Sequence, residues 1–216
     1  MLFCDLPNAT LRQFKAGDVL IAAGEPVDYV YYLLSGTVYR ETLTSSGNEY
    51  IVGRRESAKG LLSLIGVLII YDDWPVASED FIAQTDCVCY QIPKDVCKEY
   101  LRNHPELLEE ALQMSANVNA ILLDRFIARV EKNAAIEVCK FLLYYSNETE
   151  DGRILPKEFT NQQIAKFMSL HRVTVADILS VLRRRGCIAR TDRGLLLTNI
   201  PLLTDFAEQR KPLEYK

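Results

Sequence analysis

Residues 160–185 are TNQQIAKFMSLHRVTVADILSVLRRR, a segment with the pattern of two short amphipathic helices joined by a tight turn. Thr160 and Gln163 have the spacing of a capping box, in which a hydroxyl and an amide satisfy each other's backbone donors at a helix start. Apolar residues recur at helical spacing on both sides of a break at 169–171; they are Ile164, Ala165, Met168, Val175, Ile178, Leu179 and Leu182. The segment therefore predicts a helix-turn-helix.

The second predicted helix would turn a polar face outward, and that face has the dimensions to enter a DNA major groove. Its outward residues would be Arg172, Val173, Asp177, Ser180 and Arg184. The alternative is an ordinary helical hairpin whose arginines are only solvated.

The distribution of charge favours the DNA interpretation. The net charge is −4, but residues 1–131 hold 11 Lys and Arg against 19 Asp and Glu, whereas residues 132–216 hold 14 against 10. The first part is therefore at −8 and the second at +4. Seven basic residues lie in or just after the predicted helix-turn-helix, where phosphates would be met: Lys166, Arg172, Arg183, Arg184, Arg185, Arg190 and Arg193.

Composition indicates a globular protein, since 49% of the 216 residues are hydrophobic. No charged and then apolar signal segment opens the sequence, and uncharged runs such as 60–71 are too short to span a bilayer, so we expect a cytoplasmic protein without membrane contact. Six cysteines lie at scattered positions without a C-x-x-C pair, which predicts buried thiols rather than a zinc or iron-sulfur site.

Between residue 14 and about residue 92, short β-rich runs alternate with turn residues, which suits a small antiparallel barrel or roll. The runs are VLIAAGE (19–25), DYVYYLLSG (28–36), TVYRETLTSSGNE (37–49), YIVGRR (50–55) and CVCYQI (87–92).

From Pro105 to about Lys132 there is no glycine or further proline, which predicts one long helix. It would carry two apolar stripes, one at 107, 111, 114, 118 and 121, and another at 108, 112, 115, 119, 122 and 126. One stripe could pack on the roll and the other on the same helix of a second subunit, with Asn119 fixing the register. A helix buried within one chain is the alternative.

The remaining segments complete an α+β protein. Residues 134–145 predict a helix that ends at the polar turn 146–153. After the helix-turn-helix, CIARTD (187–192) and LLLTN (195–199) predict a strand-turn-strand wing, and 201–209 predict a short closing helix.

This order of elements resembles the CRP/FNR family of bacterial transcription regulators along nearly the whole chain. The matching stretches are GDVLIAAGE (17–25), LLSGTV (33–38) and TNQQIAKFMSLHRVTVADIL (160–179). The resemblance implies an effector-sensing, cyclic-nucleotide-binding-like β-roll (a double-stranded β-helix) over 1–103, a dimerisation helix over 104–132 and a winged helix-turn-helix over 133–216. It also implies a homodimer that is not an enzyme, with an operator DNA, RNA polymerase and a small effector as partners.

The same resemblance places Gly66 at the glycine of the effector loop and Ser78 at its Ser/Thr position. Cyclic-AMP receptors hold the phosphate with an arginine beside that Ser/Thr, and the ribose with a glutamate after the glycine. Here those positions are Ala77 and Val67. A phosphodiester without its arginine would be an uncompensated buried anion, which argues against a cyclic nucleotide as effector.

The adenine-facing positions of such receptors fall on Leu122 and Leu123, so the expected pocket is apolar and aromatic. It suits an apolar or aromatic small molecule, as in the halorespiration regulators of the family. The alternative is that these side chains only fill the roll, which would give a constitutive DNA binder. Haem would need axial ligands, and neither His104 nor His171 sits suitably. We expect no metal or cofactor. The candidate effector residues are Val67, Leu68, Ile70, Tyr71, Trp74, Ser78 and Leu122.

On the DNA side, the family usually presents Glu and Arg one turn apart, but here only Arg172 matches, because Val173 and Asp177 occupy the other positions. His171 replaces the usual Ser/Thr cap and is expected to donate to phosphate at the helix entry. The first helix would meet phosphate through its N-terminal residues. The resulting DNA-binding set is Thr160, Asn161, Gln162, His171, Arg172, Val173, Thr174, Asp177 and Arg184.

Two alternative functions would depend on other residues, namely histidines or cysteines. A cupin-like metal oxygenase would need histidines on the roll, and residues 1–100 contain none. A thiol-redox regulator could pair Cys4 with Cys187 across domains or subunits, although cytosolic cysteines are usually reduced and inert.

Overall fold

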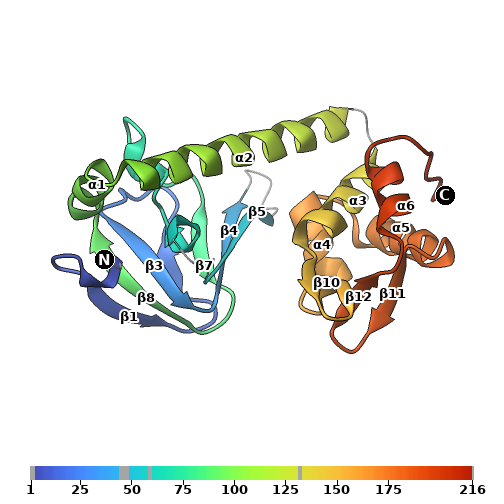
Figure 1. Ribbon diagram of the computed structural model, residues 1–216, viewed down its shortest axis with the longest axis horizontal. Coiled ribbons are helices and arrows are strands. Elements are labelled where there is room, and N and C mark those ends of the chain that lie inside the picture. Colours follow the sequence, from blue (N-terminus) through green and yellow to red (C-terminus); the bar gives the residue numbers. More distant parts are fainter. Residues whose placement is uncertain (1–2, 44–48, 58–59, 131–132, 216) are drawn as a thin grey trace. The chain divides into compact units, whose positions relative to one another are not determined.

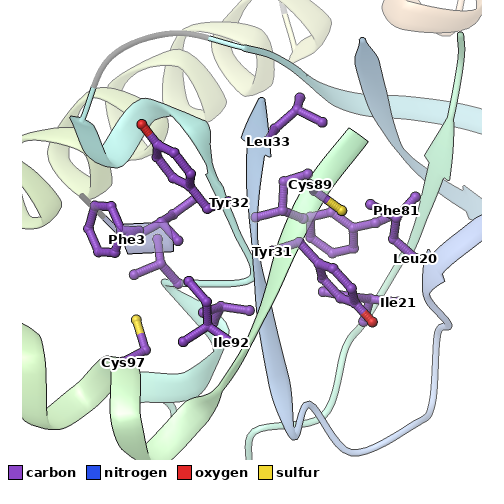
Figure 2. Close-up of a cluster of buried hydrophobic side chains, with 14 of the residues drawn as sticks. Phe3, Leu20, Ile21, Tyr31, Tyr32, Leu33, Phe81, Cys89, Ile92 and Cys97 are labelled. Carbon is purple, nitrogen blue, oxygen red and sulfur yellow. The ribbon is translucent and has the colours of Figure 1, made fainter. Parts of the chain in front are cut away.

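Strand β3 (Tyr29–Ser35) is central to the N-terminal half because both of its faces are buried. The computed structural model describes residues 3–43, 49–57, 60–130 and 133–215. Figure 2 shows Tyr32 beside Phe3 on one side of β3, and Tyr31 near Phe81 on the other. A strand covered on both faces has a continuous apolar run instead of an alternating pattern. This explains the sequence YVYYLL within β3.

Two antiparallel sheets form the predicted roll, with strand orders β1-β8-β3-β6 and β2-β7-β4-β5 (Figure 1). Five strands lie in or overlap the runs expected from the sequence, whereas β1, β6 and β7 were not expected. β1 is almost wholly exposed and β6 has two residues, so neither carries a hydrophobic pattern. Besides β3, the strands are β1 (Thr10–Phe14), β2 (Val19–Ile21), β4 (Thr37–Leu43), β5 (Glu49–Glu56), β6 (Leu64–Ile65), β7 (Asp80–Ala83) and β8 (Cys87–Pro93).

Two helices follow the roll, α1 (Lys94–Arg102) and α2 (Pro105–Val130). α1 was not expected, and it packs on β8 and β3. α2 is the predicted long helix; the last two residues of its expected range, 131–132, lie outside the described residues. Short 3-10 helices occupy Phe3–Asp5, Gly60–Ser63 and Ile69–Tyr71.

α2 buries one face and exposes another, as the two stripes predicted. Ala111 and Met114 belong to the core of the roll. Leu112 and Phe126 are 70% and 64% exposed. No helix among the described residues has the length and apolar character needed to cross a membrane.

Contacts between residues divide the chain into two units, 1–120 and 121–216, and α2 crosses the division. The division into 1–103, 104–132 and 133–216 stays a prediction. The second unit pairs its strands in the order β11-β12-β10-β9 (Figure 1). Its elements are α3 (Ala134–Tyr145), β9 (Asn147–Thr149), β10 (Gly152–Pro156), α4 (Asn161–Met168), α5 (Arg172–Arg184), β11 (Ile188–Thr191), β12 (Gly194–Leu197) and α6 (Ile200–Ala207).

One expectation in this unit was wrong in its detail. Residues 146–153 are not only a polar turn, because β9 and the start of β10 form a hairpin there. β9 is exposed at every position, so its sequence is polar and gives no strand pattern.

Gly194 begins β12 at the point where the wing strand crosses close to β10. Its φ is +146°, and a Cβ at this position would stand 2.0 Å from the carbonyl oxygen of Leu155. Gly186 also has a positive φ, +70°, but a Cβ there would meet nothing within 4 Å. A side chain at Gly186 would therefore cost only backbone strain, whereas one at Gly194 would also clash with the backbone of Leu155.

We predict that Gly194→Ala destabilises the second unit much more than Gly186→Ala. The second change should cost about 1 kcal/mol from positive φ, and the first about 3 kcal/mol or more because the backbone of Leu155 must also move. Urea unfolding of the full chain followed by circular dichroism measures both. Equal losses for the two variants would contradict the close approach at Gly194.

Candidate nucleic-acid interface

Helix α4 begins at Thr160 with half of the expected capping box. The Thr160 side chain accepts a hydrogen bond from the backbone N–H of Gln163 at 3.2 Å. The reciprocal bond is replaced, because the Thr160 N–H donates to the Glu158 carbonyl at 2.9 Å. The Gln163 Oε1 is buried without a partner among the described residues. Asn161 and Gln162 stand beside this helix start, where free N–H groups favour an anion.

The turn between α4 and α5 is tight because Ser169 adopts the left-handed conformation, with φ 52° and ψ 40°. The Leu170 N–H then donates back to the Ala165 carbonyl at 3.0 Å, which closes the end of α4. The turn fixes where α5 starts.

Helix α5 is oriented by its apolar face. Val175, Ile178 and Leu182 are fully buried, and Leu179 nearly so, as the spacing predicted. His171 is its N-cap residue, yet its side chain makes no capping hydrogen bond and is exposed. The donation from His171 to phosphate that the sequence suggested stays a prediction.

The opposite face of α5 presents the predicted base-contacting residues. Arg172, Asp177 and Arg184 are exposed, and Val173 is 70% exposed. Thr174 is half-buried. An arginine can bind guanine O6 and N7 together, a valine can contact the methyl of thymine, and a carboxylate can accept only from cytosine or adenine amines.

The wing, formed by β11 and β12, follows α5 in the sequence and carries further basic side chains. β11 and β12 pair through a turn at 192–193, and Thr191 Oγ1 donates to the Gly194 carbonyl at 3.1 Å. Arg190 is exposed. Arg193 pairs with Asp151 at 2.8 Å, and both side chains remain largely exposed. Such an exposed pair contributes little to stability, so Arg193 can exchange its partner for a phosphate.

An aromatic cluster packs α3 against the first helix of the helix-turn-helix. Phe141 on α3 lies 5.5 Å from Phe159 and 5.4 Å from Phe167, measured between ring centroids. Tyr145 packs on the same rings. These ring contacts join α3 to α4 and to the segment that precedes α4.

The structure scatters the predicted effector residues. Val67 and Ile70 lie in the core of the roll and Leu68 packs against it, whereas Tyr71 is exposed and Trp74 is 82% exposed. These five side chains do not share one surface. Leu122 is half-exposed on α2, and Ser78 is exposed. Ala77, at the position where the family resemblance expects an arginine, is buried in the core.

Sequence reasoning missed two charged residues beside Ser78. The Ser78 hydroxyl donates to the Glu79 carboxylate, and Arg40 donates to the same carboxylate from β4. No spacing pattern could have found the pair, because Arg40 lies on β4, Glu79 stands just before β7, and the two are 39 positions apart.

The cysteines differ sharply in access. Burial raises the pKa of the Cys139 thiol to about 12, and burial also raises the pKa of the Cys187 thiol. Because the thiolate is the reactive form, a raised pKa lowers the reactivity expected of both thiols at neutral pH. Cys4 is half-buried, while the other five are buried: Cys87, Cys89, Cys97, Cys139 and Cys187.

Models of two known domain families match this chain. The model of the cyclic nucleotide-binding domain matches residues 11–104, and the model of the Crp-like helix-turn-helix domain matches residues 138–206. The two matches together take in the roll, α1 and nearly all of the second unit after α2.

Known proteins are similar over most of the chain. The fumarate nitrate reduction regulatory protein of Klebsiella oxytoca is 23% identical over 207 residues, which cover 93% of this chain and 79% of the relative. The CRP-like cAMP-activated global transcriptional regulator of Mycobacterium tuberculosis is 23% identical over 190 residues, which cover 86% and 83%. A solved CooA mutant from Carboxydothermus hydrogenoformans has a TM-score of 0.75 at 16% identity and covers 92% of this chain and 88% of that one. That likeness concerns the fold alone.

We predict that iodoacetamide labels native protein at Cys4 and leaves Cys187 unmodified until the chain unfolds. The reason is that Cys187 is buried and its pKa is raised, so little thiolate reaches the reagent. Mass spectrometry of digested protein locates the label, and Cys4→Ser is the control that should lose it. Modification of Cys187 as fast as Cys4 would instead support the thiol-redox interpretation.

Proposed function

Because the chain belongs to the CRP/FNR family of DNA-binding transcription regulators, we propose that it is a homodimeric, sequence-specific regulator whose roll senses a small effector other than a cyclic nucleotide. The observation that carries the proposal is the outward face of α5. It combines Arg172, Val173 and Asp177 on a helix whose opposite face is fully buried.

Base recognition would be divided between these three residues. Arg172 lies in the first turn of α5, where a recognition helix contacts base edges. Val173 favours a thymine, and Asp177 repels the acceptor atoms of guanine. Thr160, Asn161, Gln162 and His171 would meet the phosphate backbone, together with Thr174 and Arg184. The preferred half-site should therefore differ from the one bound by members that present Glu and Arg.

The dimer is proposed from the exposed stripe of α2. Five large apolar side chains on this helix remain accessible; they are Leu112, Leu122, Leu123, Phe126 and Ile127. A monomer would present this stripe as a large apolar patch. A parallel copy of α2 would cover it, and a two-fold dimer would place two α5 helices on a two-fold symmetric operator.

The effector is proposed to be apolar or aromatic. Ala77 and Val67 are buried apolar residues at the positions where a cyclic nucleotide would need charged partners. Burying an unpaired phosphate there would cost several kcal/mol. Tyr71 and Trp74, which are both exposed, offer aromatic surface to such a ligand.

Further partners follow from the same proposal. A regulator of this kind acts on promoters, so we expect RNA polymerase as a partner and the cytoplasm as the site of action. We infer no catalytic role. A redox-controlled regulator is the second candidate, and the half-buried Cys4 is the observation that favours it.

For DNA binding, we predict that Arg172→Ala weakens operator affinity by about 1–3 kcal/mol, which is roughly 5-fold to 150-fold. If Arg172 contacts a base, the variant should lose preference at one position of a selected duplex pool. If it contacts phosphate, the loss should be uniform and the salt dependence shallower. Arg12→Ala removes an equal charge from an exposed strand of the roll and is the control. Unchanged affinity in Arg172→Ala would show that α5 does not contact DNA as proposed.

For assembly, we predict that wild-type protein sediments as a dimer at micromolar concentration and that Leu122→Glu with Phe126→Glu converts it to a monomer. Both side chains are exposed in the single chain, so the change should leave the circular dichroism of the folded chain intact while placing charge in the dimer contact. Asn117→Glu, on an exposed position outside the stripe, is the matched control. A wild-type monomer that still binds DNA tightly would disprove the dimer.

A further inference from the structure

A charged side chain lies on the inner face of the roll. Arg40 pairs directly with Phe81 across the β4–β7 ladder, and residues directly opposite in an antiparallel pair share one face of the sheet. Phe81 is buried in the apolar core. Arg40 is therefore directed toward the interior, and only 25% of its side chain is exposed.

The neighbouring strands leave room for this arginine. On β5, the residue paired with Arg40 is Gly53, where a Cβ would stand 3.2 Å from the Arg40 Cδ. On β7, the centre of the Arg40 guanidinium lies 5.7 Å from the centroid of the Phe81 ring. Gly53 leaves space for the Arg40 side chain, and the face of the Phe81 ring attracts its guanidinium.

The guanidinium and a hydroxyl converge on one carboxylate of the same chain. Arg40 Nε donates to Glu79 Oε1 at 2.7 Å, and Arg40 Nη2 also donates to that oxygen. Ser78 Oγ donates to Glu79 Oε2. Glu79 is 9% exposed, so both of its oxygens are bound by side chains in a mostly dry environment.

We propose that Arg40 and Ser78 form an oxyanion site of the roll which the chain fills with its own Glu79 carboxylate, so that Glu79 excludes anionic effectors. This inference rests on the proposed sensing role of the roll, but the site itself does not. A carboxylate and a phosphate present the same kind of oxygen to a guanidinium and a hydroxyl. While Glu79 is bound, a second anion would meet a satisfied arginine and a negative charge.

Removing the Glu79 carboxylate should let Arg40 and Ser78 bind an oxyanion from solution. Glu79→Ala leaves Arg40 as a partly buried cation without its anion, and a small oxyanion from solution can then replace the lost group. Any ligand that binds only the folded state raises the free energy of unfolding, by an amount that grows logarithmically once its concentration exceeds the dissociation constant.

The experiment is a thermal-unfolding titration of the full chain with sodium acetate and, separately, with inorganic phosphate, against chloride at equal ionic strength. The melting temperature of Glu79→Ala should rise by about 5 °C when the oxyanion is at roughly ten times its dissociation constant, and should continue to rise logarithmically above that. Wild type should show only the non-specific salt effect. Asp86→Ala, which removes an exposed carboxylate paired with Lys15, is the matched control and should behave like wild type.

The double change Arg40→Met with Glu79→Met tests whether the guanidinium is the binding group. Two apolar side chains of similar size should fold well and give no oxyanion response. If Glu79→Ala is unfolded in chloride, recovery of its native circular dichroism with added acetate or phosphate becomes the measurement. A response to acetate alone or to both anions supports the site. No response to either, or one retained by the double variant, overturns it.

DNA binding by Arg172→Ala is measured separately from this titration. Failure of the oxyanion site would therefore leave the proposed regulator intact, and failure of the DNA prediction would leave the oxyanion site intact.

Discussion

Burial of the apolar face of α5 is the constraint on which the candidate interface depends. Val175, Ile178 and Leu182 are inaccessible, so the helix cannot rotate without exposing them to water. Exposing one such side chain costs about 1.5–3 kcal/mol. Because the helical period is fixed, the same burial determines that Arg172, Val173 and Asp177 face outward. The recognition surface is thus a consequence of the core.

The elements that sequence reasoning identified are those whose side chains carry a period. Helices α2, α4 and α5 follow apolar spacing closely, and the wing follows a short strand-turn-strand pattern. β1, β9 and the two-residue β6 escaped prediction because an exposed or very short strand has no buried face to mark. The capping box was half wrong because the Thr160 N–H found a backbone acceptor in Glu158, which local spacing cannot show.

Prediction was weaker in the roll than in the DNA-binding unit for a physical reason. A helix face is composed of residues close in sequence, whereas a pocket in a roll collects side chains from distant strands. Val67 and Trp74 lie seven positions apart, yet one is in the core and the other is 82% exposed. The pairing of Arg40 with Glu79 depends on the β4–β7 register, which no periodicity specifies. Family likeness assigned an effector loop, which stays a prediction, and could not give the direction of its side chains.

Helix α2 carries both a buried face and an exposed face. Met114, on its buried face, lies in the core of the roll, and its sulfur accepts from Arg55 Nη2 on β5 at 3.6 Å. Leu112, two positions away, is on the exposed stripe. A helix has two discrete faces rather than a flexible hinge, so a change in the packing of β5 against Met114 must translate or rotate both faces together. A ligand that altered the roll would therefore act on the proposed dimer contact through α2, without needing to touch the DNA-binding unit.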